Sequence, residues 1–378
     1  MTHLLILSVA GLAGVALLIH LASIALVWPR FLRTTGSKPA QAHPAITVLR
    51  PVCGLDPDMD ETLASTFAAM SEDDEAIFCI AAADDPAIPV VKRLIDANPQ
   101  VTARLLIGDD RISGNPKLNN LAKGWAAARN DWIVMIDSNV LLPDDYIQRL
   151  FDHWTPGTGL VTSPPAGIRP VGFWAAVEAG FLNSYQDRWQ LTSDQIGNGF
   201  AQGKVLMWRR ALLEQAGGLA VLGHDLAEDV ASTKVVRAAG LKVRVLDRPL
   251  PQPLGRRTAD EVWLRQLRWA RVRRSGFPGL YAVEPLSTAA LPMVAVAGLA
   301  IAGAMPAPLA LAYPVLWYGA EWALARRAGW PSSPVQVLAW LLRDTLIPAV
   351  WLTAFASRGF VWRGNAMHDD DTALHPAE

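Results

Sequence analysis

The apolar run from Leu4 to Trp28 limits the folds open to this chain more than any other feature of its 378 residues. A helix of about 20 apolar residues is enough to cross the hydrocarbon core of a bilayer, so residues 1–30 are predicted to hold a membrane span. A cleaved signal peptide is the competing interpretation, but no basic segment precedes the run and it exceeds the usual signal length. Arg30, Arg33 and Lys38 follow, and the positive-inside rule then places the next domain in the cytoplasm.

Two further apolar stretches, Leu286 to Ala304 and Pro308 to Leu324, lie near the other end of the chain. A short turn-like joint separates them, which predicts a transmembrane hairpin over residues 286–325. Arg326 and Arg327 come directly after it and indicate a return to the cytoplasmic side.

A third apolar segment, residues 335–356, carries Arg343 and Asp344 near its middle. Charges at the centre of a bilayer are costly, so an interfacial or re-entrant helix competes evenly with a transmembrane one. The remaining residues, 357–378, are predicted to form a polar tail.

Overall composition agrees with membrane contact, because 51% of the residues are apolar and only 18% are charged. The net charge of -1 gives no reason to expect nucleic acid as a partner. Cys53 and Cys79 are the only cysteines, too few for a disulfide framework or a thiolate zinc site. Gly203 and Lys204 resemble the end of a phosphate loop, but the required Ser or Thr does not follow, so a Walker motif is rejected.

Residues 43–280 alternate short apolar runs with amphipathic segments, which predicts an α/β domain with a mostly parallel sheet covered on both faces. The predicted strands are Ile46–Leu49, Ala76–Ala82, Ala103–Ile107, Trp132–Ile136 and Leu160–Ser163. The predicted helices are Asp58–Met70, Ile88–Asn98, Leu118–Arg129 and Asp144–Trp154.

Acidic residues follow two of these predicted strands. Asp85 comes after the apolar run that ends at Ala82, and Asp137 comes directly after Ile136. Ligands of parallel sheets bind beyond the carboxyl ends of the strands, where a carboxylate can hold a divalent cation or a ribose hydroxyl. For Asp85, which precedes a proline, a turn or helix start is the alternative.

Two further elements lie downstream. Asp229 precedes a helical pattern, where it is either a helix cap or part of a site. Thr258 opens a predicted helix with a capping box, and the spacing of Arg265, Arg268 and Trp269 puts all three on one face of that helix. This basic stripe would contact either anionic lipid or the phosphates of a nucleotide.

The order of these residues resembles the ceramide glucosyltransferase family. Asp85, Asp137, Asp229 and Arg265-x-x-Arg268-Trp269 look like its D, D, D, (Q/R)xxRW pattern. Supporting stretches are Leu49-Arg50-Pro51-Val52-Cys53-Gly54-Leu55-Asp56-Pro57, Asp84-Asp85-Pro86-Ala87-Ile88, Asn115-Pro116-Lys117-Leu118-Asn119-Asn120-Leu121 and Ala227-Glu228-Asp229. The resemblance spans roughly residues 46–275. It implies a bacterial member with an inverting GT-A catalytic domain over 43–280, in a multi-pass protein of the cytoplasmic (inner) membrane.

The resemblance also implies a donor, UDP-glucose, and an acceptor, the primary hydroxyl of ceramide. Asp137 would hold a divalent cation, Mg or Mn, and Asp85 would contact the uridine portion of the donor. Asp229 would be the general base. Arg268 would meet the diphosphate and Trp269 would wall the sugar or acceptor site, while Arg265 completes the donor-binding motif.

One departure from the family bears on the cation, because Asp137-Ser138-Asn139 lacks the third-position Asp of a full DxD motif. Two alternatives to ceramide glucosylation stay open. One is a same-fold transferase acting on a hopanoid or another lipid alcohol, with UDP-N-acetylhexosamine as a possible donor. The other is a non-catalytic membrane scaffold.

Overall fold

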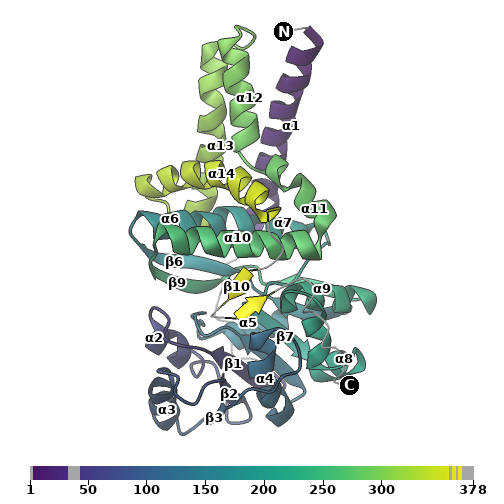
Figure 1. Cartoon of the computed structure of the whole chain (residues 1–378), viewed down its shortest axis with the longest axis vertical. Coiled ribbons are helices and arrows are strands. Elements are labelled where there is room, and N and C mark those ends of the chain that lie inside the picture. The colour runs from purple at the N-terminus through teal and green to yellow at the C-terminus, as the bar shows by residue number, and fades with distance from the viewer. Residues whose placement is uncertain (1–2, 33–42, 357–359, 363–364, 368–378) are drawn as a thin grey trace. The chain divides into compact units, whose positions relative to one another are not determined.

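A computed structural model of the protein describes residues 3–32, 43–356, 360–362 and 365–367 (Figure 1). The chain forms two compact units. One, the helical unit, comprises residues 1–33, 167–192 and 256–357, and the other, the sheet unit, comprises residues 34–166, 193–255 and 358–378. Arg33, Lys38 and most of the predicted polar tail, 357–378, lie outside the described residues.

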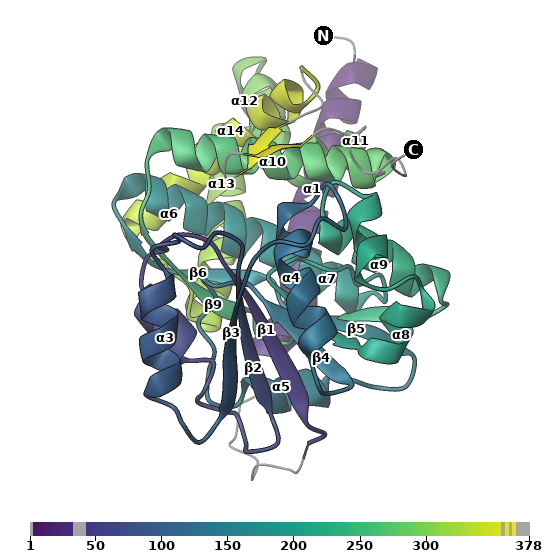
Figure 2. The ribbon, with the colours of Figure 1, turned by 60° about the horizontal axis from the view of Figure 1, so that its bottom comes forward.

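The sheet unit is built on a seven-stranded sheet with the strand order β3-β2-β1-β4-β7-β5-β8. Its strands are β1 Ile46–Val52, β2 Glu75–Ile80, β3 Thr102–Ile107, β4 Trp132–Ile136, β5 Thr158–Thr162, β7 Val205–Arg209 and β8 Lys242–Val245. Neighbouring strands are parallel except where β7 pairs with β4 and β5, and Figure 2 shows β3, β2, β1 and β4 side by side. The predicted α/β class with a mostly parallel sheet is confirmed, whereas the antiparallel β7 was not among the predicted strands.

Helices cover both faces of this sheet, as the near-continuous apolar strands predict. One face packs against residues of α4, α8 and α9, and the other packs against residues of α2, α3 and α5. Their bounds are α2 Met59–Ala64, α3 Ile88–Asp96, α4 Pro116–Ala127, α5 Tyr146–Asp152, α8 Arg210–Gln215 and α9 Glu228–Ala238, with the 3-10 turn η3 at Leu219–His224. The predicted helix Asp58–Met70 is wrong beyond Ala64, because hydrogen bonds between residues three apart replace the helical pattern there.

Three elements carry the chain from one unit to the other: β6 Pro165–Val171, α7 Arg188–Gln195 and β9 Leu250–Arg256. The helical unit itself contains α1 His3–Val27, η1 Trp28–Phe31, α6 Phe173–Ala179, the π-helix η2 Gly180–Asp187, α10 Ala259–Gly276, α11 Pro278–Val283, η4 Glu284–Ser287, α12 Ala290–Ile301, α13 Ala307–Ala328 and α14 Pro334–Ala354. A short antiparallel hairpin, β10 Phe360–Trp362 with β11 Asn365–Met367, follows these helices in the chain.

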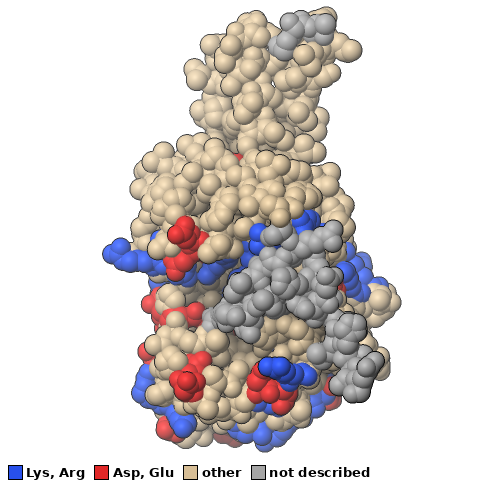
Figure 3. Space-filling view, viewed as in Figure 1, with Lys and Arg blue, Asp and Glu red and all other residues tan. Residues whose placement is uncertain are grey.

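Within the helical unit, α1, α12 and α13 pack against one another and run together (Figure 1). Apart from the residues that are not described, the upper part of the view in Figure 3, over these helices, shows uncharged residues, whereas Arg326 and Arg327 are exposed in the last turn of α13. By length and composition, His3–Phe31 and α14 can each cross a membrane, and the bent pair Pro278–Ser287 and Ala290–Ile301 would make a third span if it acts as one. The membrane crossing of α13 stays a prediction.

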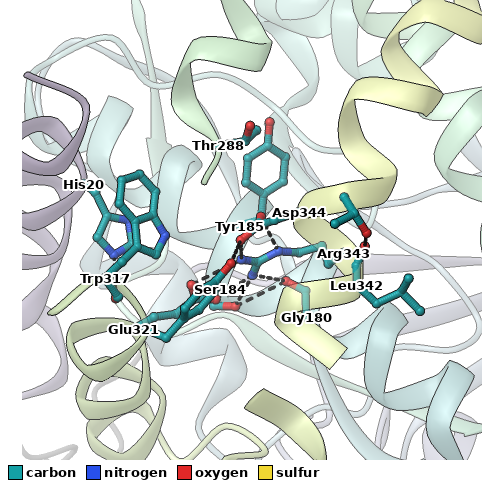
Figure 4. Close-up of polar contacts among 12 residues, drawn as sticks. His20, Gly180, Ser184, Tyr185, Thr288, Trp317, Glu321, Leu342, Arg343 and Asp344 are labelled. Carbon is teal, nitrogen blue, oxygen red and sulfur yellow. Dashed lines mark hydrogen bonds and ion pairs between the residues drawn. The ribbon is translucent and has the colours of Figure 1, made fainter. Parts of the chain in front are cut away.

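The helix α14 lies crosswise to α12 and α13 and packs against α6 and α10 (Figure 1). Its two charged residues, Arg343 and Asp344, are buried, and Arg343 forms ion pairs with Asp344 at 2.9 Å and with Glu321 of α13 at 2.5 Å. Ser184 accepts a further hydrogen bond from Arg343 (Figure 4). The Tyr318 hydroxyl donates one to Asp344. We call these five side chains the Arg343 cluster. Within it, the charges of Arg343 and Asp344, which are unfavourable in a membrane span, have partners inside the protein.

Candidate active site

The predicted acidic residues Asp85 and Asp137 both follow strands that end at one edge of the sheet. The strands β1, β2 and β4 are parallel, so their carboxyl ends meet there, and the antiparallel β7 begins at the same edge. Ile136 pairs with Val205, and the Asp137 backbone N–H donates to the Lys204 carbonyl at 3.0 Å. The reversal of β7 therefore brings Lys204 beside Asp137.

Two lysines hold the Asp137 carboxylate. Lys117 Nζ lies 2.6 Å from Oδ1 and Lys204 Nζ lies 2.9 Å from Oδ2, and Lys204 also donates to Asn139 Oδ1 at 3.0 Å. Burial opposes ionisation of this carboxyl, but the two ammonium groups outweigh it and hold the pKa of Asp137 below its usual range. Asp137 is therefore a permanent carboxylate near neutral pH.

The position of Lys117 follows from the start of α4. Asn115 caps this helix by accepting from the Lys117 N–H at 2.9 Å, and Pro116 occupies the first helical position. Lys117 Nζ then reaches Glu228 Oε1 and the Gly203 carbonyl, both at 2.6 Å. Asn115 donates its amide to the other Glu228 oxygen at 3.1 Å. One helix start thus positions a cation against two carboxylates, and we call Lys117, Asp137, Lys204, Glu228 and Asp229 the Lys117 cluster.

Asp229 lies in the first turn of α9, next to Glu228, and its Oδ2 accepts the Gly203 N–H at 3.0 Å. Burial, together with the neighbouring Glu228 carboxylate, raises the pKa of Asp229 to about 7. A carboxyl with this pKa exchanges a proton readily at neutral pH, which is what a general base requires. Gly203 is needed here, because a Cβ at this position would lie 2.6 Å from Glu228 Oε1.

Arg50 of β1 supports the segment that follows β4. Its side chain is fully buried, and its Nη2 donates to the carbonyls of Thr62, Ser138 and Val140 at 3.0, 3.1 and 3.2 Å. Ser138 in turn donates its hydroxyl to Asp56 at 2.8 Å. These contacts hold the backbone that carries Asp137.

Asp85 takes the turn role that the sequence left open. Its Oδ2 accepts the Gly54 N–H and its Oδ1 accepts the Ala87 N–H, each at 2.8 Å. The Asp85 side chain thereby joins the segments that follow β1 and β2. A contact between Asp85 and uridine stays a prediction.

The basic motif residues Arg265, Arg268 and Trp269 lie on α10 in the helical unit, and Thr258 opens this helix with the predicted capping box. Arg265 donates to Glu178 of α6, a fully buried carboxylate that also pairs with Arg257 at 3.0 Å. Arg268 and Trp269 are half-buried. The ion pair assigns Arg265 a role in holding α10 against α6, and the donor contacts of all three residues stay predictions.

The fit of a divalent cation depends on Asp137. No group of three or more His, Cys, Asp and Glu within the described ranges is arranged to hold a metal ion. Asp137 nevertheless offers a carboxylate and Asn139 an amide oxygen, and Mg²⁺ commonly binds one or two carboxylates together with substrate phosphates. Both Asp137 oxygens and Asn139 Oδ1 contact Lys117 or Lys204, so these residues fit a cation that replaces the lysine contacts and that the diphosphate of a donor helps to hold.

Four residues of this site were given no role in the sequence analysis: Lys117, Gly203, Lys204 and Glu228. Asn115-Pro116 is a helix-start signal, which places Lys117 in a first turn but does not identify its partners. Gly203-Lys204 comes directly before β7, and only the pairing of β7 with β4 shows why these two residues matter.

The sequence of the chain is similar to those of known proteins. The sequence model of glycosyl transferase family 21 matches residues 11–372. Ceramide glucosyltransferase 3 of Caenorhabditis elegans is 26% identical over 362 residues, which cover 93% of this chain and 78% of the relative. Ceramide glucosyltransferase 1 of the same organism is 27% identical over 87% of this chain and 72% of its own. A ceramide glucosyltransferase of Komagataella phaffii is 40% identical over 124 residues, 32% of this chain and 24% of the relative.

Two solved structures are similar at lower identity. One is the mannosyltransferase PcManGT of Pyrobaculum calidifontis, solved with GDP-Man and Mn2+, which is 19% identical with a TM-score of 0.49. The match covers 89% of this chain and 99% of the PcManGT chain. Glucosyl-3-phosphoglycerate synthase of Mycobacterium tuberculosis, solved with Mn2+, UDP and glucosyl-3-phosphoglycerate, is 19% identical, covers 65% of this chain and 88% of its own, and has a TM-score of 0.37.

Proposed function

The chain belongs to glycosyl transferase family 21 and is a sugar-transferring enzyme, and from this premise we propose that it moves glucose from UDP-glucose to the primary hydroxyl of ceramide with inversion. The names of the relatives that match most of the chain support glucose as the transferred sugar and ceramide as the acceptor. The observation that carries the proposal is Asp229, a carboxyl with a pKa of about 7 next to Glu228, which Lys117 links to Asp137.

Asp229 acts as the general base in this proposal. Its ionised carboxylate accepts the proton of the ceramide hydroxyl while the hydroxyl oxygen attacks the anomeric carbon of glucose. The bond from that carbon to the UDP oxygen breaks on the opposite face, and UDP leaves with the electron pair. A pKa of about 7 suits this task, because the base is both substantially ionised and still basic at neutral pH.

The leaving UDP gains negative charge, which cationic groups stabilise. Within the Lys117 cluster, Lys117 and Lys204 supply positive charge, and Arg268 of α10 is the proposed diphosphate contact, with Trp269 as a wall of the sugar or acceptor site. A divalent cation bound by Asp137 and Asn139 would supply further stabilisation of the same charge. Activity that survives chelation with EDTA, without a gain on adding Mg²⁺ or Mn²⁺, would remove the cation from this proposal.

A lipid acceptor explains why the same chain carries apolar helices. We propose that the protein is a multi-pass protein of the cytoplasmic membrane, anchored by α1, α12 and α13, with its catalytic residues on the cytoplasmic side. Arg30, Arg326 and Arg327 at the ends of these helices support this orientation by the positive-inside rule. The buried Arg343 cluster and the crosswise direction of α14 favour an interfacial position for that helix.

The proposal is tested in membranes from a host that expresses the full chain, supplied with UDP-glucose and ceramide. Wild-type membranes should form glucosylceramide, and Asp229→Asn should lower the rate by about 10² to 10⁴-fold, the usual contribution of a general base. Asp225→Asn is the matched control, because Asp225 pairs with the exposed Lys234 nearby and should stay within about twofold of wild type. Near wild-type activity of Asp229→Asn would exclude Asp229 as the base.

Mass spectrometry of the lipids formed by the same membranes identifies the acceptor and the sugar. A hexose added to ceramide supports the proposal. Sugar added instead to a hopanoid or another lipid alcohol, or an N-acetylhexosamine product, would replace it with the same-fold alternative. No UDP release with any lipid would exclude a UDP-sugar as the donor.

A further inference from the structure

An open groove lies where α13 ends and α14 begins, inside the helical unit. Its lining contains no residue of the candidate active site. It has a volume of about 850 Å³. Its lining is formed by one aromatic ring, one guanidinium, two serines and three apolar residues: Trp322, Arg326, Ser332, Ser333, Pro334, Val337 and Leu338. The groove therefore combines an apolar surface with a single cationic end.

The walls of the groove are held by local contacts. Trp322 Nε1 donates to the Ser332 carbonyl at 3.0 Å, which ties α13 to the segment before α14. Gly329, with a φ of +75°, ends α13 in a left-handed turn, and Ser333 caps the start of α14. The groove is thus built into the turn between the two helices.

Large apolar side chains stay exposed along the groove. Trp322 is 43% exposed and Leu338 is 57% exposed, and Val337 is half-buried between them in the lining. Exposed apolar groups of this size are unfavourable in water and mark contact with a membrane or another apolar partner. Because the exposed residues of α13 before Arg326 are all uncharged, a lipid chain is the occupant that this setting favours.

The charge beside this apolar surface is positive, and no Asp or Glu among the described residues forms an ion pair with it. Residues 322–342 contain Arg326 and Arg327 and no Asp or Glu, and the flanking Glu321 and Asp344 are buried and paired with Arg343. The Arg326 guanidinium lies over the Trp322 ring, 5.5 Å from its centroid. This contact holds the guanidinium beside the aromatic wall of the groove. Arg327 is also exposed but does not line the groove.

From these observations we propose that the groove binds one anionic phospholipid of the surrounding bilayer. Arg326 binds the phosphate, because a guanidinium recognises phosphate in bidentate fashion, and the Ser332 hydroxyl is placed to donate to it. One acyl chain lies on Trp322, Val337 and Leu338. Ceramide fits this groove less well, since it has no phosphate to balance the arginine. Basic pockets beside transmembrane helices on the cytoplasmic side are known sites for anionic headgroups.

The test uses the full chain in nanodiscs of phosphatidylcholine that contain a trace of photo-crosslinkable phosphatidylglycerol. After irradiation, mass spectrometry of peptides should locate the label in residues 322–338. Arg326→Gln should lower this labelling by about tenfold, as expected for the loss of a hydrogen-bonded ion pair. Arg327→Gln is the matched control and should change it less than about twofold, because trace anionic lipid produces little surface potential.

A second pair of variants tests the apolar part. Leu338→Trp should fill the groove and lower labelling, whereas Leu341→Trp, on an exposed residue outside the lining, should not. Equal effects of Arg326→Gln and Arg327→Gln, or unchanged labelling in both Arg326→Gln and Leu338→Trp, would overturn the proposal. So would displacement of the label by millimolar inorganic phosphate, which would indicate a phosphate site without a lipid chain. None of these outcomes depends on the donor or acceptor of the transfer reaction.

Discussion

The two buried charge clusters of this protein differ in the partners of their carboxylates. In the Arg343 cluster, a single arginine faces Glu321 and Asp344, and all three are 3% exposed or less. In the Lys117 cluster, Lys117 is shared between Asp137 and Glu228, and Asp229 has backbone N–H partners while it adjoins a second carboxylate. Each carboxylate of the Arg343 cluster pairs directly with the arginine, whereas Asp229, among the described residues, accepts hydrogen bonds from backbone N–H groups alone and titrates near neutral pH.

If the Arg343 cluster is structural, breaking it should have the largest effect on stability. Arg343→Met leaves Glu321 and Asp344 buried without their cation, and we expect the free energy of unfolding to fall by about 3 to 5 kcal/mol. Thermal or denaturant unfolding in detergent measures the loss. The control is the triple change Arg343→Met, Glu321→Gln, Asp344→Asn, which removes all three charges and should recover most of the stability. If Arg343→Met were as stable as wild type, a structural role for the Arg343 cluster would be contradicted.

The Lys117 cluster should instead respond in its pH dependence. Lys117 lowers the pKa of Asp229, so Lys117→Met should move the acid limb of the activity profile above pH about 7. Activity requires ionised Asp229. A rise of one unit in its pKa would therefore lower the rate about tenfold at a pH well below the acid limb. Lys117→Arg keeps the charge and serves as the control. The midpoint of a pH profile does not depend on the amount of folded enzyme, which separates this effect from lost stability.

Glu228→Gln should shift the acid limb in the opposite direction. The Glu228 carboxylate raises the pKa of Asp229, so its neutral amide should move the acid limb below pH about 7 while the contact with Lys117 is kept by the amide oxygen. The same pH–rate measurement is made on Glu214→Gln, which alters a carboxylate bonded to Trp125 and should leave the limb unchanged. A shift in the same direction as that of Lys117→Met would refute the assigned charges.

Much of the fold was predictable from the sequence because its signals are local. Apolar runs identified β1 to β5, and Thr258 with Glu261 identified the start of α10. The antiparallel β7 was not found, because a strand's direction depends on its partners and not on its own composition. Position within the motif pattern singled out Asp137 and Asp229, but the partners of Asp137 lie 20 residues before it, at Lys117, and 67 residues after it, at Lys204.

The sequence by itself determined that this chain joins apolar helices to an α/β domain and carries an ordered set of acidic and basic motif residues. It also left the segment 335–356 open, because periodicity and hydropathy do not show whether a buried charge has a partner. Only the tertiary structure decided that Arg343 forms ion pairs with Glu321 and Asp344 and that Lys117 is shared between Asp137 and Glu228. The reason is physical: the ionisation of a buried group depends on the charges within a few ångströms, and folding alone brings these together.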